Sequence, residues 1–393
     1  MNTAILNIDI QQFINQKLNS EITSLLLKGV PSFSVEIKEI IEQIEAKKRC
    51  EKKLPTWFKT QNIYYPNKLN IEQTSSEITA NYKSDLIHGE SIIDLTGGFG
   101  VDCFYFSKTF KTVFHCEINK TLSEIVKHNY NQFSIKNIET NAIDGIDYLK
   151  NSDTNFDWIY LDPSRRHDNK GKVFFLNDCL PNVPQHSDLL FKHSKNILIK
   201  TSPLLDISIG IGELKHVKTI HVVAVNNEVK ELLWILEAGF EAEITIKTVN
   251  IKKEATDYFE FLIENEKLIA SQYNEPLTYL YEPNSAILKA GAFNSISNKL
   301  NVFKLHKHSH LYTSETLLNF PGRCFKIENV LAYNKKALKN LRITRANITT
   351  RNFPETVEDL RKKFNIKDGG DSYLFFTTDV ENKKIVILAS KMA

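Results

Sequence analysis

The chain has 393 residues, which is too long for one ordinary hydrophobic core, so we expect roughly two to four domains. Apolar residues make up 42% of the sequence, enough to fill such cores, and this argues against global disorder. No run approaches the roughly 18 to 20 apolar residues of a membrane span. The amino terminus lacks the basic and then apolar stretches of a secretory signal. We therefore expect neither a membrane segment nor export.

The formal net charge is only +3, but it is unevenly distributed. Residues 301–393 contain 17 Lys and Arg against 9 Asp and Glu, a balance of +8, whereas the preceding part of the chain has a balance of −5. A basic end on a mildly acidic body suits a polyanionic partner, and RNA is the natural candidate. A solvated, lysine-rich surface would explain the same charge equally well.

The cysteines are few and scattered. The five lie at positions 50, 103, 116, 179 and 324 and form no CxxC pair. This argues against a zinc ribbon or a disulfide framework and suits a reducing compartment. We predict a cytoplasmic protein without a metal site.

The first part of the chain, residues 1–53, reads as a helical region. Ile10, Phe13, Ile14 and Leu18 recur at helical spacing in it. A second helix is predicted over 71–87, with Thr74 or Ser75 as its N-cap and Glu77 at capping-box distance from Thr74.

From residue 91 short apolar runs alternate with helical stretches. This alternation predicts an α/β domain whose parallel sheet is covered by helices on both faces. Residues 243–251 and 258–265 are predicted as antiparallel strands that close the sheet. The five apolar runs cover 91–95, 112–116, 158–162, 196–200 and 219–225.

After about residue 270 the pattern changes to a small α+β unit, and a second such unit begins near 321. It ends in two apolar segments, 373–378 and 384–390, that predict a hairpin. We expect an N-terminal helical region at 1–53, a cofactor domain at 54–270 and two small domains at 271–320 and 321–393.

A glycine-rich turn follows the first apolar run, in the segment Asp94-Leu-Thr-Gly-Gly-Phe-Gly100. Glycines at such a turn let the backbone approach a ligand and direct N–H groups at it. Asp94, Thr96, Gly97, Gly98 and Gly100 are therefore candidate cofactor residues. The spacing is not GxGxxG, which argues against a nicotinamide dinucleotide.

Two further acidic positions follow apolar runs. Glu117 comes after the second run, 23 residues beyond Asp94, where a carboxylate can accept both hydroxyls of a ribose. The alternative for Glu117 is a surface residue at a strand end. Asp162 begins the segment Asp-Pro-Ser-Arg-Arg directly after the run that ends in Leu161. A carboxylate and free carbonyl groups there would stand beside a bound cofactor.

The segment that starts at Asp162 gives the candidate catalytic residues, and the basic residues around it give the candidate RNA-binding residues. The basic residues could hold a phosphate backbone, although a solvated basic loop is an equal alternative. The catalytic candidates are Asp162, Pro163, Ser164 and Arg165; the RNA-binding candidates are Arg165, Arg166, Lys170 and Lys172.

These motifs resemble those of bacterial class I S-adenosylmethionine-dependent methyltransferases that carry a ferredoxin-like domain and a C-terminal THUMP-like domain. The acidic-xxx-Gly-x-Gly turn matches their first motif, and Asp-Pro matches the start of their fourth. Longer matching stretches are EQTSSEITANYKSDLI (72–87), DLTGGFGVD (94–102), YEPNSAILKAG (281–291) and RNFPETVEDLRKKFNIKDGGDSYLF (351–375).

The resemblance implies a Rossmann-like sheet, S-adenosylmethionine as the cofactor and a cofactor loop that wraps its methionine part. It also implies that Asp144 contacts the adenine, although Asp144 could equally be a helix N-cap, and that the helix with Gln73, Ser75 and Ser76 covers the cofactor. True THUMP domains deliver RNA, usually the acceptor end of tRNA. The chain departs from the pattern of nitrogen-methylating members, because Ser164 and Arg165 stand where those members have proline and an aromatic residue.

Our leading hypothesis is therefore a methyltransferase that acts on RNA such as tRNA. One alternative is an RNA-binding protein whose methyltransferase domain has lost turnover, and a weaker one is a dehydrogenase. Methylation at carbon would need a cysteine nucleophile; Cys179 is the one candidate for it, since Cys103 and Cys116 fall on apolar elements.

Overall fold

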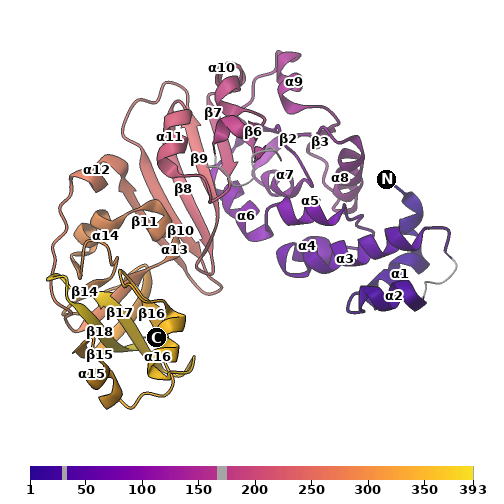
Figure 1. Cartoon of the computed structure of the whole chain (residues 1–393). Helices are drawn as coiled ribbons and strands as arrows, with labels where there is room; N and C mark the ends of the chain where they lie inside the picture. Colours follow the sequence, from indigo (N-terminus) through magenta and orange to yellow (C-terminus); the bar gives the residue numbers. More distant parts are fainter. Residues whose placement is uncertain (29–32, 166–174, 393) are drawn as a thin grey trace. The chain divides into compact units, whose positions relative to one another are not determined.

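The computed structural model describes residues 1–28, 33–165 and 175–392, and it is an α/β protein (Figure 1). The chain divides into two compact units, residues 1–218 with 233–241 and residues 219–232 with 242–393. Among the described residues, no helix combines the length and the apolar character needed to cross a membrane.

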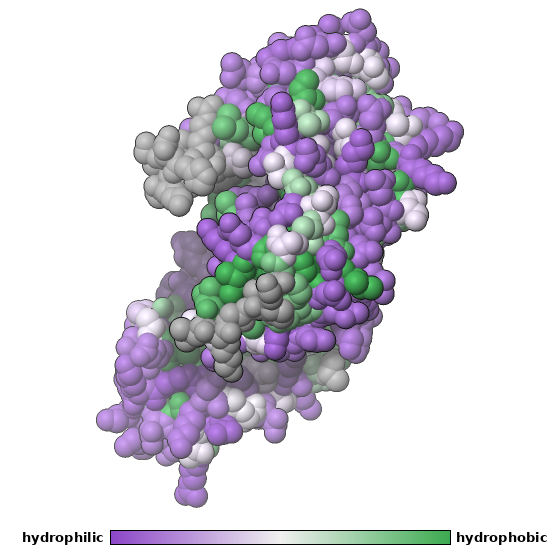
Figure 2. All heavy atoms as spheres, turned by 90° about the vertical axis from the view of Figure 1, so that its right-hand side faces the viewer, coloured by the Kyte–Doolittle hydropathy of each residue, from purple (hydrophilic) through white to green (hydrophobic). Residues whose placement is uncertain are grey.

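Helices form the first part of unit 1, as the sequence predicts for residues 1–53. Ile10 and Ile14 lie buried in a cluster with Ile5, Ile40 and Ile44, which confirms the predicted apolar face. Figure 2 shows the side on which these helices lie: hydrophilic residues cover most of it, with hydrophobic patches between them. The helices are η1 (Thr3–Leu6), α1 (Ile8–Lys17), α2 (Ile22–Lys28), α3 (Ile37–Lys53), α4 (Pro55–Lys59), α5 (Lys68–Gln73) and α6 (Glu77–Leu86).

The helix predicted within 71–87 is present as α6, but its N-cap is Ser76 instead of Thr74 or Ser75, and residues 71–73 belong to the separate helix α5. Ser76, in extended conformation, is the N-cap of α6 and accepts from the N–H of Thr79. The predicted capping box is also wrong. The Glu77 carboxylate instead accepts hydrogen bonds from the N–H and hydroxyl of Thr56 and from the hydroxyl of Tyr105.

A nine-stranded sheet follows, in the order β11-β10-β8-β9-β7-β4-β1-β2-β3. The pairs β7–β4, β4–β1, β1–β2 and β2–β3 are parallel, which confirms the predicted parallel sheet. The strands are β1 (Gly89–Asp94), β2 (Phe110–Cys116), β3 (Ile138–Asn141), β4 (Trp158–Leu161), β7 (Asn196–Thr201), β8 (Val217–Val225), β9 (Glu228–Glu237), β10 (Thr245–Ile251) and β11 (Thr256–Leu262). The helices between them are α7 (Val101–Phe106), α8 (Lys120–Gln132), α9 (Gly145–Lys150), η3 (Leu176–Asp178), α10 (Val183–His193) and α11 (Ile207–Glu213).

The connections place a topological switch point at β1. The chain runs from β1 outward through β2 to β3 and then crosses back to β4 on the other side of β1. In open α/β sheets ligands bind beyond the carboxyl ends of the strands at such a point. The antiparallel pair predicted to close the sheet is confirmed as β10 and β11.

The C-terminal part is α+β, with a seven-stranded sheet in the order β13-β14-β12-β15-β18-β17-β16. The predicted hairpin is confirmed, since β17 and β18 pair antiparallel. Strand β15 pairs with both β12 and β18, so the two predicted small units share this sheet. Leu338 of α15 and Leu360 of α16 pack in one hydrophobic cluster with Phe376 of β17. The elements are α12 (Ile263–Leu268), β12 (Tyr279–Pro283), α13 (Ser285–Ala290), α14 (Phe293–Leu300), β13 (Phe303–Lys304), β14 (Tyr312–Ser314), β15 (Gly322–Ala332), α15 (Lys335–Asn340), β16 (Asn347–Thr350), α16 (Val357–Phe364), β17 (Ser372–Thr378) and β18 (Lys384–Lys391).

Candidate active site

Three predicted acidic residues lie at one edge of the sheet. Asp94 ends β1, Glu117 directly follows β2, and Asp162 directly follows β4. Strands β4, β1 and β2 are neighbours and run parallel, so their carboxyl ends meet at the same edge. This edge is the one at which the switch point predicts a ligand.

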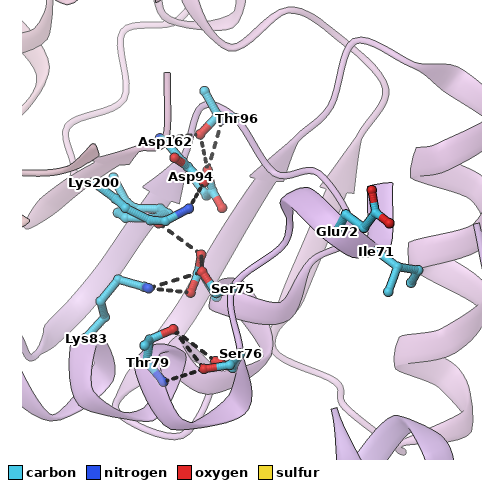
Figure 3. Close-up of polar contacts among 12 residues, drawn as sticks. Ile71, Glu72, Ser75, Ser76, Thr79, Lys83, Asp94, Thr96, Asp162 and Lys200 are labelled. Atoms are coloured by element: carbon cyan, nitrogen blue, oxygen red, sulfur yellow. Dashed lines mark hydrogen bonds and ion pairs between the residues drawn. The ribbon is translucent and has the colours of Figure 1, made fainter. Parts of the chain in front are cut away.

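Thr96 ties the glycine turn to the reaction loop (Figure 3). Its N–H and hydroxyl donate to Asp94 Oδ1 at 2.9 and 3.1 Å. The N–H of Asp162 in turn donates to Thr96 Oγ1 at 2.7 Å. The two predicted motifs, 66 residues apart in the sequence, are thus held together by one hydroxyl.

Glu117 holds the same loop, and Asp144 begins the helix that packs against it. Glu117 Oε2 accepts from the N–H of Gly98 at 2.9 Å, and the side chain is partly exposed. Asp144 caps α9 by accepting from the N–H groups of Ile146 and Asp147. A Cβ at Gly145 would lie 2.4 Å from the carbonyl oxygen of Leu95, so the cap packs directly against the glycine turn. Asp94, Glu117 and Asp162 thus form hydrogen bonds with residues 96–98, and Asp144 precedes the glycine that packs against Leu95.

Gly97 and Gly98 are favoured in the turn for different structural reasons. A Cβ at Gly97 would meet the buried His115 ring at 2.3 Å, so internal packing requires this glycine. Gly98 has a φ of +53°, and the nearest atom to a Cβ there would be 3.7 Å away. A Cβ at Gly98 would thus have one neighbour within 4 Å, the carbonyl oxygen of Thr96. This uncrowded backbone and the partly exposed Glu117 carboxylate beside it are compatible with a ribose-bearing cofactor.

Asp94 faces the interior and is 2% exposed. Burial raises the pKa of Asp94 to about 7, against the opposing hydrogen bonds from Thr96 and with a smaller contribution from Asp102. The Asp94 carboxyl thus positions the turn from below through Thr96, and Thr96 carries its effect to the reaction loop.

Because Asp94 binds its proton more tightly in the folded chain than in the unfolded one, stability should fall as the pH rises from about 4 to about 7. Asn has no proton to lose. The free energy of unfolding of Asp94→Asn, measured relative to that of the parent, should therefore rise by about 3 kcal/mol from pH 5 to pH 8. One pKa unit corresponds to about 1.4 kcal/mol. Urea unfolding at both pH values measures this gain. Asp153→Asn, at an exposed position, is the control, and an equal effect of Asp94→Asn at both pH values would contradict the assignment.

A buried polar network that the sequence analysis missed lies beneath the turn. Lys83 of α6 is 0% exposed, and its Nζ lies 3.2 Å from Asp102 Oδ1. Ser75 and Tyr160 donate to Asp102 Oδ2 at 2.8 and 2.9 Å. Burial alone would raise the pKa of Asp102, but Lys83, Lys200 and these hydrogen bonds hold it below its ordinary value. The network joins the segment before α6 to α7 and β4.

Lys200, at the carboxyl end of β7, is the other residue that was missed. Its ammonium forms an ion pair with Asp162 Oδ2, and the two side chains are 13% and 31% exposed. Leu161 and Ile199 are register partners in the parallel pair of β4 and β7, so the next residues of the two strands stand side by side. The candidate reaction loop therefore carries a cation as well as a carboxylate.

The rest of the reaction loop is only partly described. Pro163 is buried and Ser164 is exposed. Strand β5 (Ser164–Arg165) pairs antiparallel with β6 (Cys179–Leu180). The predicted RNA-binding residues Arg166, Lys170 and Lys172 lie outside the described residues.

The three cysteines considered as possible nucleophiles are not exposed. Cys103, Cys116 and Cys179 are all buried. Burial raises the pKa of the Cys116 thiol to about 12. The Cys179 thiol donates to the carbonyl oxygen of Phe175 at 3.5 Å. A cysteine-dependent transfer to carbon therefore gains no support.

A solved structure matches nearly the whole chain. A protein from Porphyromonas gingivalis W83, whose crystal structure is described as that of a "putative methyltransferase", is 33% identical, with 98% of each chain covered and a TM-score of 0.89. An rRNA methylase from Streptococcus thermophilus covers 41% of this chain and 93% of its own, at 12% identity and a TM-score of 0.31. A second match of the same TM-score is to SMU.1697c of Streptococcus mutans, described as a putative methyltransferase in complex with SAH, at 14% identity over 41% of this chain and 96% of the other.

Family models match the C-terminal part of the chain. A ferredoxin-like domain model matches residues 279–321, and a THUMP domain-like model matches residues 322–391. A comparison with curated proteins gave no match. The expected Rossmann-like α/β class is confirmed, since the nine-stranded sheet and the C-terminal α+β sheet correspond to the fold of the Porphyromonas protein. The chain therefore belongs to the same methyltransferase-like family as that protein, with ferredoxin-like and THUMP-like domains at its C-terminal end.

Proposed function

We propose that this chain is an S-adenosylmethionine-dependent methyltransferase that acts on RNA, such as tRNA, in the cytoplasm. One observation carries the proposal: Asp94, Glu117 and Asp162, from three neighbouring parallel strands, all bind the loop Thr96–Gly98. The chain is also 33% identical over 98% of its length to a protein described as a putative methyltransferase.

In this proposal the glycine turn and the two acidic residues beside it hold the cofactor. Glu117 accepts hydrogen bonds from the ribose hydroxyls, and Asp144 lies near the adenine. The open side of Gly98 leaves room for close approach of the cofactor to the backbone. The cofactor supplies a methyl group that is already electrophilic on its sulfonium, so the protein's contribution is mainly positioning. The binding residues are Asp94, Thr96, Gly97, Gly98, Gly100, Glu117 and Asp144.

The acceptor is oriented at the reaction loop by the Asp162 carboxylate and the Pro163 carbonyl, with Ser164 and Arg165 beside them. Arg165, Arg166, Lys170 and Lys172 hold phosphate or the base. In the proposed division, residues 54–270 form the cofactor domain, while 271–320 and 321–393 present the RNA.

The direct test is methyl transfer from labelled S-adenosylmethionine to RNA taken from cells that lack the gene, so that target sites are unmodified. We expect label in RNA, and none when RNA from normal cells is used. Binding of cofactor and RNA without incorporation of label would favour the alternative, an RNA-binding protein that has lost turnover.

The RNA role of the C-terminal part can be tested on α15. Lys335, Lys336 and Lys339 are exposed on this helix. Replacing all three with Gln should weaken RNA binding about 10-fold. The slope of log K against log salt concentration should become less steep by about 2, since each phosphate contact contributes roughly 0.7 to 0.9 to that slope. Filter binding at several salt concentrations measures both.

A matched control removes the same charge from unit 1. Lys120, Lys127 and Lys136 are exposed in and after α8, and their replacement with Gln should leave RNA affinity within about twofold. Equal losses in the two triple variants would mean that RNA binding follows net charge alone.

A further inference from the structure

We infer that the methylated atom is a ring nitrogen of a nucleobase that carries a hydrogen and lies next to a carbonyl group, as N1 of guanosine or N3 of uridine does. We also infer that Lys200 takes part in its methylation. The inference rests on the proposed function and names the acceptor class for the same site. It is carried by the ion pair between Lys200 and Asp162.

The pair stands where the acceptor must lie if the glycine turn holds the cofactor. Asp162 follows β4, and its N–H is fixed to Thr96 Oγ1 at 2.7 Å. Lys200 is the penultimate residue of the adjacent strand β7, at the same edge of the sheet (Figure 3). Both side chains are partly buried, so their charges act in a medium less polarisable than water.

The pair suits a ring amide better than an exocyclic amine. The lone pair of an exocyclic amine is conjugated with the ring, but no proton has to leave before it attacks the methyl carbon, so hydrogen-bond acceptors on the N–H groups suffice at its site. A nearby ammonium would oppose the approach of that lone pair to a sulfonium. A ring N–H next to a carbonyl has no lone pair in the ring plane until its proton leaves, and the negative charge then develops on the carbonyl oxygen.

A carboxylate next to a cation meets both of these needs. The Asp162 carboxylate takes the proton from the ring nitrogen, and the Lys200 ammonium stabilises the charge that develops on the carbonyl oxygen. The ring nitrogen forms a bond to the methyl carbon as the methyl–sulfur bond breaks, which leaves the neutral thioether of S-adenosylhomocysteine. The proton on Asp162 then passes to water.

The first test is the identity of the product. RNA from cells that lack the gene is methylated in vitro with labelled S-adenosylmethionine, digested to nucleosides and analysed by mass spectrometry. Label on a ring nitrogen next to a carbonyl is the expected result. Label on an exocyclic amine, a ribose hydroxyl or carbon would overturn the inference while leaving the methyltransferase proposal intact. No label in any RNA would overturn the proposed function and the inference with it.

The second test separates Lys200 from cofactor binding. Lys200→Met should lower kcat by about 100-fold or more, the cost of losing one charge-stabilising donor, while calorimetry shows S-adenosylhomocysteine affinity within about twofold of the parent. Lys200→Arg, which keeps the cation, should recover part of kcat. Lys218→Met is the control, because Lys218 pairs with Glu237 on the exposed surface of unit 1. A parent-like kcat in Lys200→Met would overturn the role, as would a matching loss in cofactor affinity.

Discussion

Replacing Lys83 with methionine should lower the free energy of unfolding of unit 1 by about 3–5 kcal/mol, because it leaves the Asp102 carboxylate buried without its nearest cation. Lys83 is 0% exposed and also donates to Ser75 Oγ at 3.1 Å, so water cannot replace it. All three tryptophans, at positions 57, 158 and 234, belong to unit 1, so urea unfolding followed by tryptophan fluorescence reports this unit.

Two further variants make the Lys83 result specific. Removing the charge on both partners, as in Lys83→Met with Asp102→Asn, should recover a large part of the loss. Lys111→Met removes one side of an exposed pair with Glu90 and should cost at most about 1 kcal/mol. A loss from Lys83→Met as small as that from Lys111→Met would show that the network does not stabilise the fold.

Replacing Glu117 with alanine should weaken the binding of S-adenosylhomocysteine by roughly 10- to 150-fold, since hydrogen bonds to a charged group contribute about 1.5–3 kcal/mol. The loss has two sources in the proposed site. The ribose hydroxyls lose their acceptor, and the N–H of Gly98 loses the carboxylate that positions it. Isothermal titration calorimetry measures the change.

Glu90→Ala is the matched control for Glu117, because Glu90 lies on β1 near its amino end, away from the glycine turn. It should bind S-adenosylhomocysteine like the parent protein. An unchanged affinity in Glu117→Ala would remove Glu117 from the cofactor site.

The acidic strand ends could be predicted from the sequence because each apolar run stops at a polar residue. Apolar runs also gave the central strands in their correct places. Lys200 ends such a run too, by the same logic as Asp162. A lysine at a strand end is ordinarily solvated, however, and only the pairing of β4 with β7 brings it against Asp162.

Other elements could not be derived from local pattern. Residues 232–236 of β9 are continuously apolar, a pattern that a buried strand and a buried helix share. Residues 71–87 have helical periodicity, yet α5 ends at Gln73 and α6 begins at Glu77, and Ser75 between them donates to the buried Asp102 carboxylate. Both elements involve contacts between residues far apart in the sequence, and a local sequence pattern does not show such contacts.

The most direct test of the account is a crystal structure of the protein with S-adenosylhomocysteine. We predict the ribose on the Glu117 carboxylate, the backbone of Gly98 against the ligand, and the sulfur directed toward Asp162 and Lys200. Failure of the ligand to bind would contradict the account, and so would a ligand bound away from the carboxyl ends of β1, β2 and β4.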